Sequence, residues 1–149
     1  VVAAEGGEVR LRLFFPGAGA WLVAEERTLY LEGADADLGT IAAEVLAGPR
    51  GERLFAPFPP GTEVGHVYVS EAGIAYIDLV STAPNPPPSG SRQEMLSVYS
   101  VVNSVQSNLP DLKGVVLLWN GQQRPTFAGH LDTGRPLAED RSLVSGGSR

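Results

Sequence analysis

The residues best suited to chemistry in this chain are two histidines and a few isolated carboxylates, because the chain contains no cysteine. The lack of cysteine excludes thiol catalysis, disulfides and thiolate zinc sites. His130 and Asp132 are separated by one residue, and alternate residues of an extended chain point to the same side. A histidine and a carboxylate on one side could form a base with its orienting group, or bind a metal ion.

A structural role explains His130 and Asp132 better. A metal site needs three or four protein ligands, and the sequence has neither an HExxH motif nor a histidine-rich cluster to supply them. Asp132 directly precedes residues 133–136, whose sequence Thr-Gly-Arg-Pro is typical of a turn that an aspartate side chain brackets. We therefore predict no metal site and no cofactor, and we keep both residues as functional candidates without a catalytic role.

Asp78 is the third candidate, because it interrupts an otherwise apolar run at residues 74–79. Such a carboxylate could be buried with a raised pKa and act as a general acid, or it could accept hydrogen bonds from a neighbouring loop. No second carboxylate stands at a predictable distance, and no GxSxG motif or phosphate-binding loop is present. A hydrolase that uses Asp78, His130 and Asp132 is therefore the function we favour least, and we expect a protein that is not an enzyme.

Composition indicates one soluble globular domain. The 149 residues are 43% hydrophobic and 19% charged, which is enough apolar material for a core. Eleven Lys and Arg against 17 Asp and Glu give a formal charge of −6. An acidic chain argues against unspecific nucleic-acid binding, since that binding depends on contacts between cations and phosphates.

The elements that must position these residues follow from hydrophobic periodicity. Alternating or continuous apolar runs bounded by turn residues predict strands at residues 9–15, 27–32, 64–69, 74–79 and 115–119. A helix is predicted from Leu38 to Leu46, with Asp37 as its N-cap and a stop at Gly48 and Pro49.

The loop at residues 50–62 is rich in proline and contains Gly61. Its three large apolar residues, Leu54, Phe55 and Phe58, indicate that it is pinned to the body of the domain rather than free.

The second helix has the clearest signals. Ser91 followed by Glu94 predicts a capping box at its start, and Pro110 ends it. Its apolar stripe is wide, so the helix should be covered over much of its circumference. Its other positions carry small, uncharged polar residues, and its many β-branched residues make it an intrinsically weak helix that packing must hold.

A hairpin is predicted after the strand at 115–119. Asn120 and Gly121 suit the two left-handed positions of a type I′ turn, and residues 123–127 would return as a strand that Pro125 confines to an edge or a bulge. The order is ββαββαββ, which predicts an α+β fold with a mixed, mainly antiparallel sheet and two helices on one face.

Six ordered motifs resemble the GerMN domain of the sporulation and spore germination family. They are residues 45–49 (VLAGP), 59–62 (PPGT), 75–79 (AYIDL), Glu94 at the start of the long helix, 115–121 (VVLLWNG), and 126–132 (TFAGHLD) with 135–137 (RPL). The resemblance covers residues 9–138, which leaves residues 1–8 as a trimmed N-terminal linker and 139–149 as a C-terminal tail. It implies a fold related to the ring-building motifs of secretion and sporulation machines.

The resemblance also implies a function. Family members usually lie outside the cytoplasmic membrane behind a lipoprotein signal or a membrane anchor, and no enzymatic activity is assigned to the domain. We therefore expect an extracytoplasmic assembly domain that binds an envelope protein or its own kind. The alternative is a module that binds peptidoglycan or another cell-wall glycan, for which four aromatic residues could supply stacking faces: Trp21, Tyr30, Tyr68 and Trp119.

Overall fold

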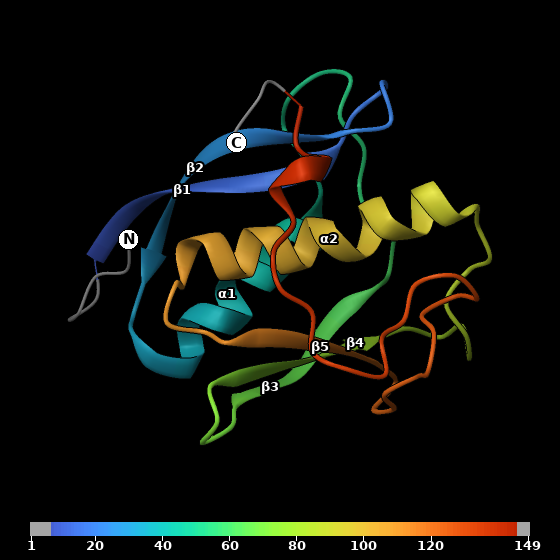
Figure 1. Cartoon of the computed structure of the whole chain (residues 1–149). Coiled ribbons are helices and arrows are strands. Elements are labelled where there is room, and N and C mark those ends of the chain that lie inside the picture. The colour runs from blue at the N-terminus through green and yellow to red at the C-terminus, as the bar shows by residue number, and fades with distance from the viewer. Residues whose placement is uncertain (1–6, 146–149) are drawn as a thin grey trace.

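Two sheets enclose two helices in this α+β domain (Figure 1). The computed structural model describes residues 7–145. The elements in chain order are β1 (Gly7–Pro16), β2 (Leu22–Leu31), α1 (Ala34–Ala47), β3 (Glu63–Val69), β4 (Ile74–Val80), α2 (Ser91–Asn108), β5 (Gly114–Trp119) and the short 3-10 helix η1 (Arg141–Leu143).

The strands form two sheets where one was predicted. β1 and β2 are an antiparallel hairpin, whereas β3, β4 and β5 form a separate sheet in that order. The second sheet is mixed, as predicted, because β3 runs antiparallel to β4 and β5 runs parallel to it. Both helices lie on one face of this sheet, and the β1–β2 hairpin covers them from the opposite side (Figure 1).

α2 lies between the two sheets and buries side chains toward both of them. Val98, Val101, Val102 and Val105 are fully buried, and they belong to one core with residues of both sheets. Burial of these four valines between the two sheets offsets the low helix propensity of β-branched residues. The prediction of a helix held by its packing is confirmed.

Small polar residues on α2 also reach the free edge of β1. Ser104 Oγ accepts a hydrogen bond from the Phe14 N–H at 2.8 Å. Asn108 Nδ2 donates to the carbonyl oxygen of Arg12 at 2.8 Å. Side chains of α2 therefore make the hydrogen bonds that a neighbouring strand would make along this edge of the hairpin.

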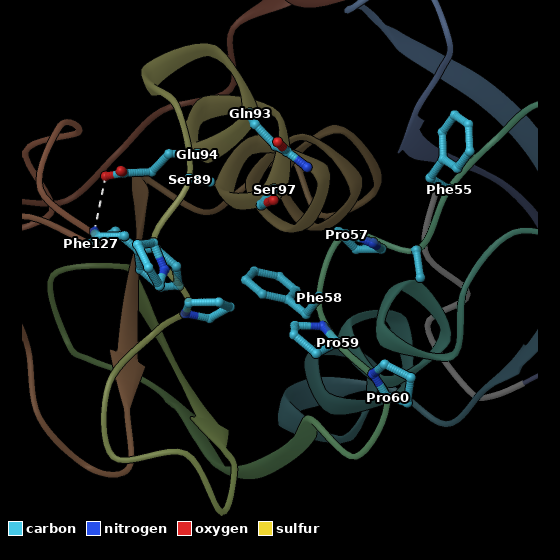
Figure 2. A pocket seen from close by; sticks show the side chains of 14 residues that line it. Phe55, Pro57, Phe58, Pro59, Pro60, Ser89, Gln93, Glu94, Ser97 and Phe127 are labelled. Atoms are coloured by element: carbon cyan, nitrogen blue, oxygen red, sulfur yellow. Dashed lines mark hydrogen bonds between the residues drawn. The ribbon is translucent and has the colours of Figure 1, made fainter.

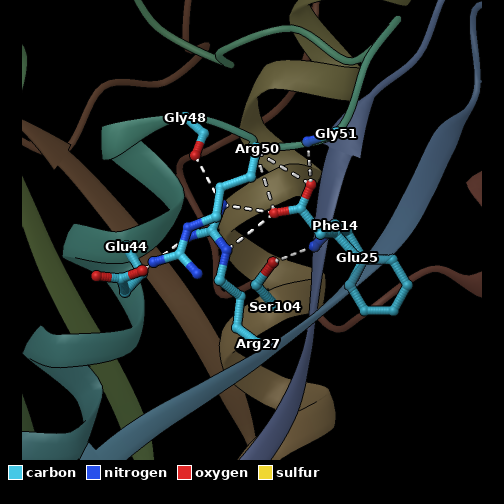
Figure 3. A network of polar contacts seen from close by, with 8 residues as sticks. All are labelled: Phe14, Glu25, Arg27, Glu44, Gly48, Arg50, Gly51 and Ser104. Atoms are coloured by element: carbon cyan, nitrogen blue, oxygen red, sulfur yellow. Dashed lines mark hydrogen bonds and ion pairs between the residues drawn. The ribbon is translucent and has the colours of Figure 1, made fainter.

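A buried arginine ties β2 to the end of α1 (Figure 3). The Arg27 side chain is 2% exposed and bonds Glu25, Glu44 and the carbonyl oxygen of Gly48. Burial would raise the pKa of Glu25, but the N–H of Gly51 and the Arg27 guanidinium hold that pKa below its ordinary value. This cluster fixes the point at which the chain leaves α1, and Gly48 there has φ of 95°, which suits the predicted glycine stop.

The two predicted N-caps are wrong. Gly33 is the N-cap of α1, and Asp37 lies inside the helix, from which its Oδ1 accepts the N–H groups of Glu32 and Gly33. Gly90 is the N-cap of α2 and no side chain caps that helix, so Ser91 and Glu94 form no capping box. The Glu94 carboxylate instead accepts hydrogen bonds from backbone N–H groups of residues 128–131, described below.

The loop at residues 50–62 is pinned to the body as predicted, but by two of the three expected residues. Phe58 is buried in the core and Leu54 packs against it, whereas Phe55 is 54% exposed. Gly61 has φ of 90°, a conformation that favours glycine.

The Asn120–Gly121 turn is confirmed, and the strand expected after it is wrong. Asn120 and Gly121 have φ of 50° and 83°, and Trp119 and Gln122 exchange two backbone hydrogen bonds. Beyond Gln122 the chain leaves the sheet, because Pro125 has no N–H to donate to a ladder. The outer edge of β5 pairs instead with Leu137, through two bonds of 2.8 Å to Val115.

The end of the described chain packs on the body where a tail was expected. Asn103 exchanges two hydrogen bonds with the backbone of Asp140, and Leu143 and Val144 are buried. The Ser145 N–H donates to the carbonyl oxygen of Leu22 at 2.7 Å. The expected linker at 1–8 overlaps β1 from Gly7 onward, and residues 1–6 and 146–149 lie outside the described part.

Candidate functional site

A buried carboxylate at the start of α2 organises the loop at residues 126–134. The Glu94 side chain is 0% exposed. Its Oε2 accepts three backbone N–H groups, from Ala128 at 3.0 Å, His130 at 3.1 Å and Leu131 at 2.8 Å. Its Oε1 lies 2.9 Å from His130 Nδ1.

These contacts keep Glu94 ionised. Burial alone would raise the pKa of its carboxyl group, but the N–H groups of Leu131 and Ala128 and the His130 ring outweigh burial and hold that pKa below its ordinary value. Three backbone donors that converge on one oxygen stabilise the charged form directly. The loop therefore wraps around a fixed negative charge.

His130 does have a carboxylate partner, but it is Glu94 and not Asp132. The His130 side chain is 45% exposed, so one side of the ring faces solvent while Nδ1 faces Glu94. Asp132 is exposed and accepts hydrogen bonds from its own turn, from the Gly134 N–H at 2.9 Å and from Arg135 Nε at 3.2 Å. Asp132 thus brackets its turn, which is the role the sequence favoured.

Asp78 takes the second of its two predicted roles. It lies half-buried on β4, and its Oδ1 accepts the Gly121 N–H at 2.7 Å. Asp78 therefore stabilises the Asn120–Gly121 turn and does not share a site with His130. Within residues 7–145, no group of three or more histidine, aspartate or glutamate residues could hold a metal ion.

Sequence reasoning missed the pairing of Glu94 with residues 128–131. Glu94 was assigned to a local cap because the signal for a capping box is local. A usable signal was present: Arg92 and Glu94 are the charged residues of a helix whose other polar positions are uncharged. A single acidic residue in such a helix indicates a specific partner, and the partner comes from a loop more than thirty positions away.

An apolar groove runs along the N-terminal half of α2, beside Glu94 (Figure 2). One hollow of about 520 Å³ is lined by prolines of two loops and by Phe58 and Phe127, which meet edge to face at 5.9 Å. A second hollow of about 550 Å³ extends toward the β1–β2 turn. The two are continuous, because both are lined by Phe55, Ala56, Pro57, Gln93 and Ser97.

The four aromatic residues considered for glycan stacking do not gather on one surface. Trp119 is buried and donates its Nε1–H to the carbonyl oxygen of Ala83 at 3.0 Å. Trp21 directly precedes β2 and Tyr30 lies near the far end of that strand, whereas Tyr68 stacks on Tyr76 across β3 and β4 at 4.8 Å. Binding of a glycan stays a prediction.

The fold is the α+β fold of GerMN domains, as comparison with solved structures shows. The first GerMN domain of the sporulation protein GerM from Bacillus subtilis matches with a TM-score of 0.67 at 19% identity, over 89% of this chain and 98% of that one. The tandem GerMN domains of the same protein match with a TM-score of 0.63 at 19% identity, over 90% of this chain and 46% of that one.

A third structure, a provisionally assigned lipoprotein from Clostridium perfringens, matches with a TM-score of 0.60 at 17% identity, over 94% of this chain and 95% of that one. The family described as sporulation and spore germination matches residues 12–125. The chain belongs to that family, which is not a known enzyme class. No curated protein matches the chain, and among residues 7–145 no helix is long and apolar enough to cross a membrane.

Proposed function

We propose that this chain is a non-enzymatic interaction or assembly domain that acts outside the cytoplasmic membrane of a bacterium. One observation carries the proposal: the groups best suited to chemistry already serve the fold, while an apolar groove beside them stands open. Glu94 holds a loop, Asp78 supports a turn and Asp132 brackets another. The groove presents prolines, phenylalanines and neutral polar groups.

The second sheet offers a further surface for association. β3 is the outer strand of its sheet, with β4 on its inner side. An outer strand carries backbone N–H and C=O groups to which a partner strand can form hydrogen bonds. The bulge between Val64 and Val67 interrupts its register, and such bulges limit unspecific pairing along an edge.

The location is inferred from relatives. The sporulation protein GerM and a provisionally assigned lipoprotein share this fold. A lipid-modified protein is attached to a membrane surface by its anchor, and its folded domain lies outside the bilayer. Protease treatment of intact cells that have been stripped of their wall tests the location: the domain should be digested while a cytoplasmic control protein survives.

Photo-crosslinking tests the interaction. A photoreactive residue in place of Tyr30, Phe55 or Tyr68, all at least 50% exposed, should give adducts with an envelope protein or a second copy of the domain. The three positions sample different surfaces of the protein. No adduct from any of them in cells that express the full-length protein would contradict an assembly role.

A further inference from the structure

The groove along α2 carries one positive charge that the fold does not neutralise. The charged residues that line its two hollows are Arg92 and Glu94. Glu94 is buried and its carboxylate is occupied by the loop at 128–131. Arg92 makes no ion pair with a carboxylate anywhere in residues 7–145. The groove therefore presents a cation in a chain whose formal charge is −6.

Arg92 is also held in place. Its Nε donates to the carbonyl oxygen of Ala20 at 2.9 Å, and its guanidinium lies 4.8 Å from the centre of the Trp21 ring. These two contacts leave the terminal N–H groups without a hydrogen-bond partner among the described residues. A guanidinium fixed by stacking presents a rigid pair of donors that matches a carboxylate.

Between Arg92 and the apolar end of the groove, α2 supplies neutral polar groups. Gln93 and Ser97 line both hollows, and neither side chain has a hydrogen-bond partner within residues 7–145. An amide and a hydroxyl can both donate and accept. They suit the N–H and C=O groups of an extended main chain, which need one donor and one acceptor per residue.

The walls of the groove are stiff and apolar. Pro57, Pro59 and Pro60 of one loop line it (Figure 2), and so do Pro87 and Pro88 of another. Proline fixes its own φ, so walls built from it lose little conformational entropy when a ligand binds. Apolar walls with a few oriented polar groups are typical of a binding site rather than of a plain surface.

We propose that this groove binds an extended peptide segment of a protein partner, in which an acidic group pairs with Arg92 and adjacent apolar residues lie between the proline walls. The proposal rests on the interaction function proposed above and adds the site and the chemistry of the partner. A peptide fits better than a glycan, because the unpaired Arg92 suits an acidic side chain, and because Phe58 and Phe127 are buried, at 5% and 4% exposed, which leaves Phe55 as the one exposed phenylalanine among the described residues that line the groove.

Selection from a phage-displayed library of random peptides tests the chemistry of the groove. The whole domain should enrich peptides that carry Asp or Glu next to apolar residues or proline. For a synthetic peptide from that set, Arg92→Gln should raise the Kd by about tenfold, the usual scale of one charge-assisted contact. Arg92→Lys keeps the charge but loses the paired donors, so it should have a smaller effect.

Two variants block or open the groove itself. Ser97→Tyr should fill the junction of the hollows and abolish binding, and Phe55→Ala, at a residue that is 54% exposed, should weaken it even if Ser97→Tyr is unstable. Tyr30→Ala, outside the groove, is the matched control and should bind normally. Absence of enriched peptides, enrichment without acidic residues, or equal binding by Phe55→Ala would each overturn the proposal.

The outcomes separate this proposal from the broader one. Crosslinked proteins from Tyr30 or Tyr68 but none from Phe55 would contradict the groove and leave the assembly function standing. No protein adduct from any of the three positions would contradict both. Retention of the domain on purified sacculi that is lost in Phe55→Ala would assign the groove to a glycan and overturn the peptide proposal.

Discussion

The two halves of α2 have the same kind of residues and use them differently. In the C-terminal half, Ser104, Asn108 and Asn103 bond the backbone of β1 and of residue 140. In the N-terminal half, Gln93 and Ser97 have no partner within the described residues and line a groove. Whether a polar residue on a helix stabilises the fold or lines a binding surface therefore depends on the residues that surround it.

Glu94, like Arg92, does have partners in the N-terminal half, and the loss of Glu94 should have the largest effect. Glu94→Ala leaves three backbone N–H groups without their acceptor, and we expect the free energy of unfolding to fall by about 3 kcal/mol, the range for hydrogen bonds to a charged group. Glu94→Gln keeps an acceptor oxygen and should cost about 1 kcal/mol. Urea unfolding measures both, and equal losses in the two variants would show that burial and not hydrogen bonding matters here.

Acid should weaken the same contact. The pKa of Glu94 is lowered in the folded protein from its ordinary value of 4.5. A group with a depressed folded pKa contributes stability above its unfolded pKa, and this contribution is lost as the pH falls through the folded pKa. The free energy of unfolding should therefore drop below about pH 4.5, and less steeply in Glu94→Gln. An identical pH dependence in both proteins would mean that Glu94 makes no special contribution.

Truncation in the C-terminal half should have a smaller but measurable effect. Asn108→Ala removes the donor to the Arg12 carbonyl, and Ser104→Ala removes the acceptor for the Phe14 N–H. Each leaves a backbone group at the edge of β1 without its partner, so we expect losses of about 1–2 kcal/mol. Hydrogen exchange of the Phe14 amide should also accelerate in Ser104→Ala. Unchanged exchange would show that the edge of β1 is protected by other groups.

The groove-lining positions should change stability least. Gln93→Ala and Ser97→Ala remove no hydrogen bond of the described structure, so each should alter the free energy of unfolding by less than about 0.5 kcal/mol. Thermal unfolding of Ser97→Ala and Ser104→Ala is a matched test, because both variants truncate a serine on the same helix. A loss at Ser97 as large as that at Ser104 would erase the contrast between the two halves.

The sequence predicted local elements well and their assembly less well. The helices, the Asn120–Gly121 turn and the strands depend on periodicity and turn chemistry, which are local. The split into two sheets depends on what covers α2, and the loop around Glu94 joins positions far apart in the chain. The same limit explains the site: Asp132 was placed correctly because its partners are two and three residues away.

The bonds along the edges of the β1–β2 hairpin have a consequence for how the chain folds. The hairpin is synthesised before α2, yet its edges are completed by Ser104, Asn108 and Ser145, which are made later. Contacts between such distant positions slow folding, because a long loop must close before any of them forms. The edges of the nascent hairpin therefore stay unpaired until residues 104–145 have been made, an interval in which a chaperone would protect it from pairing with other chains.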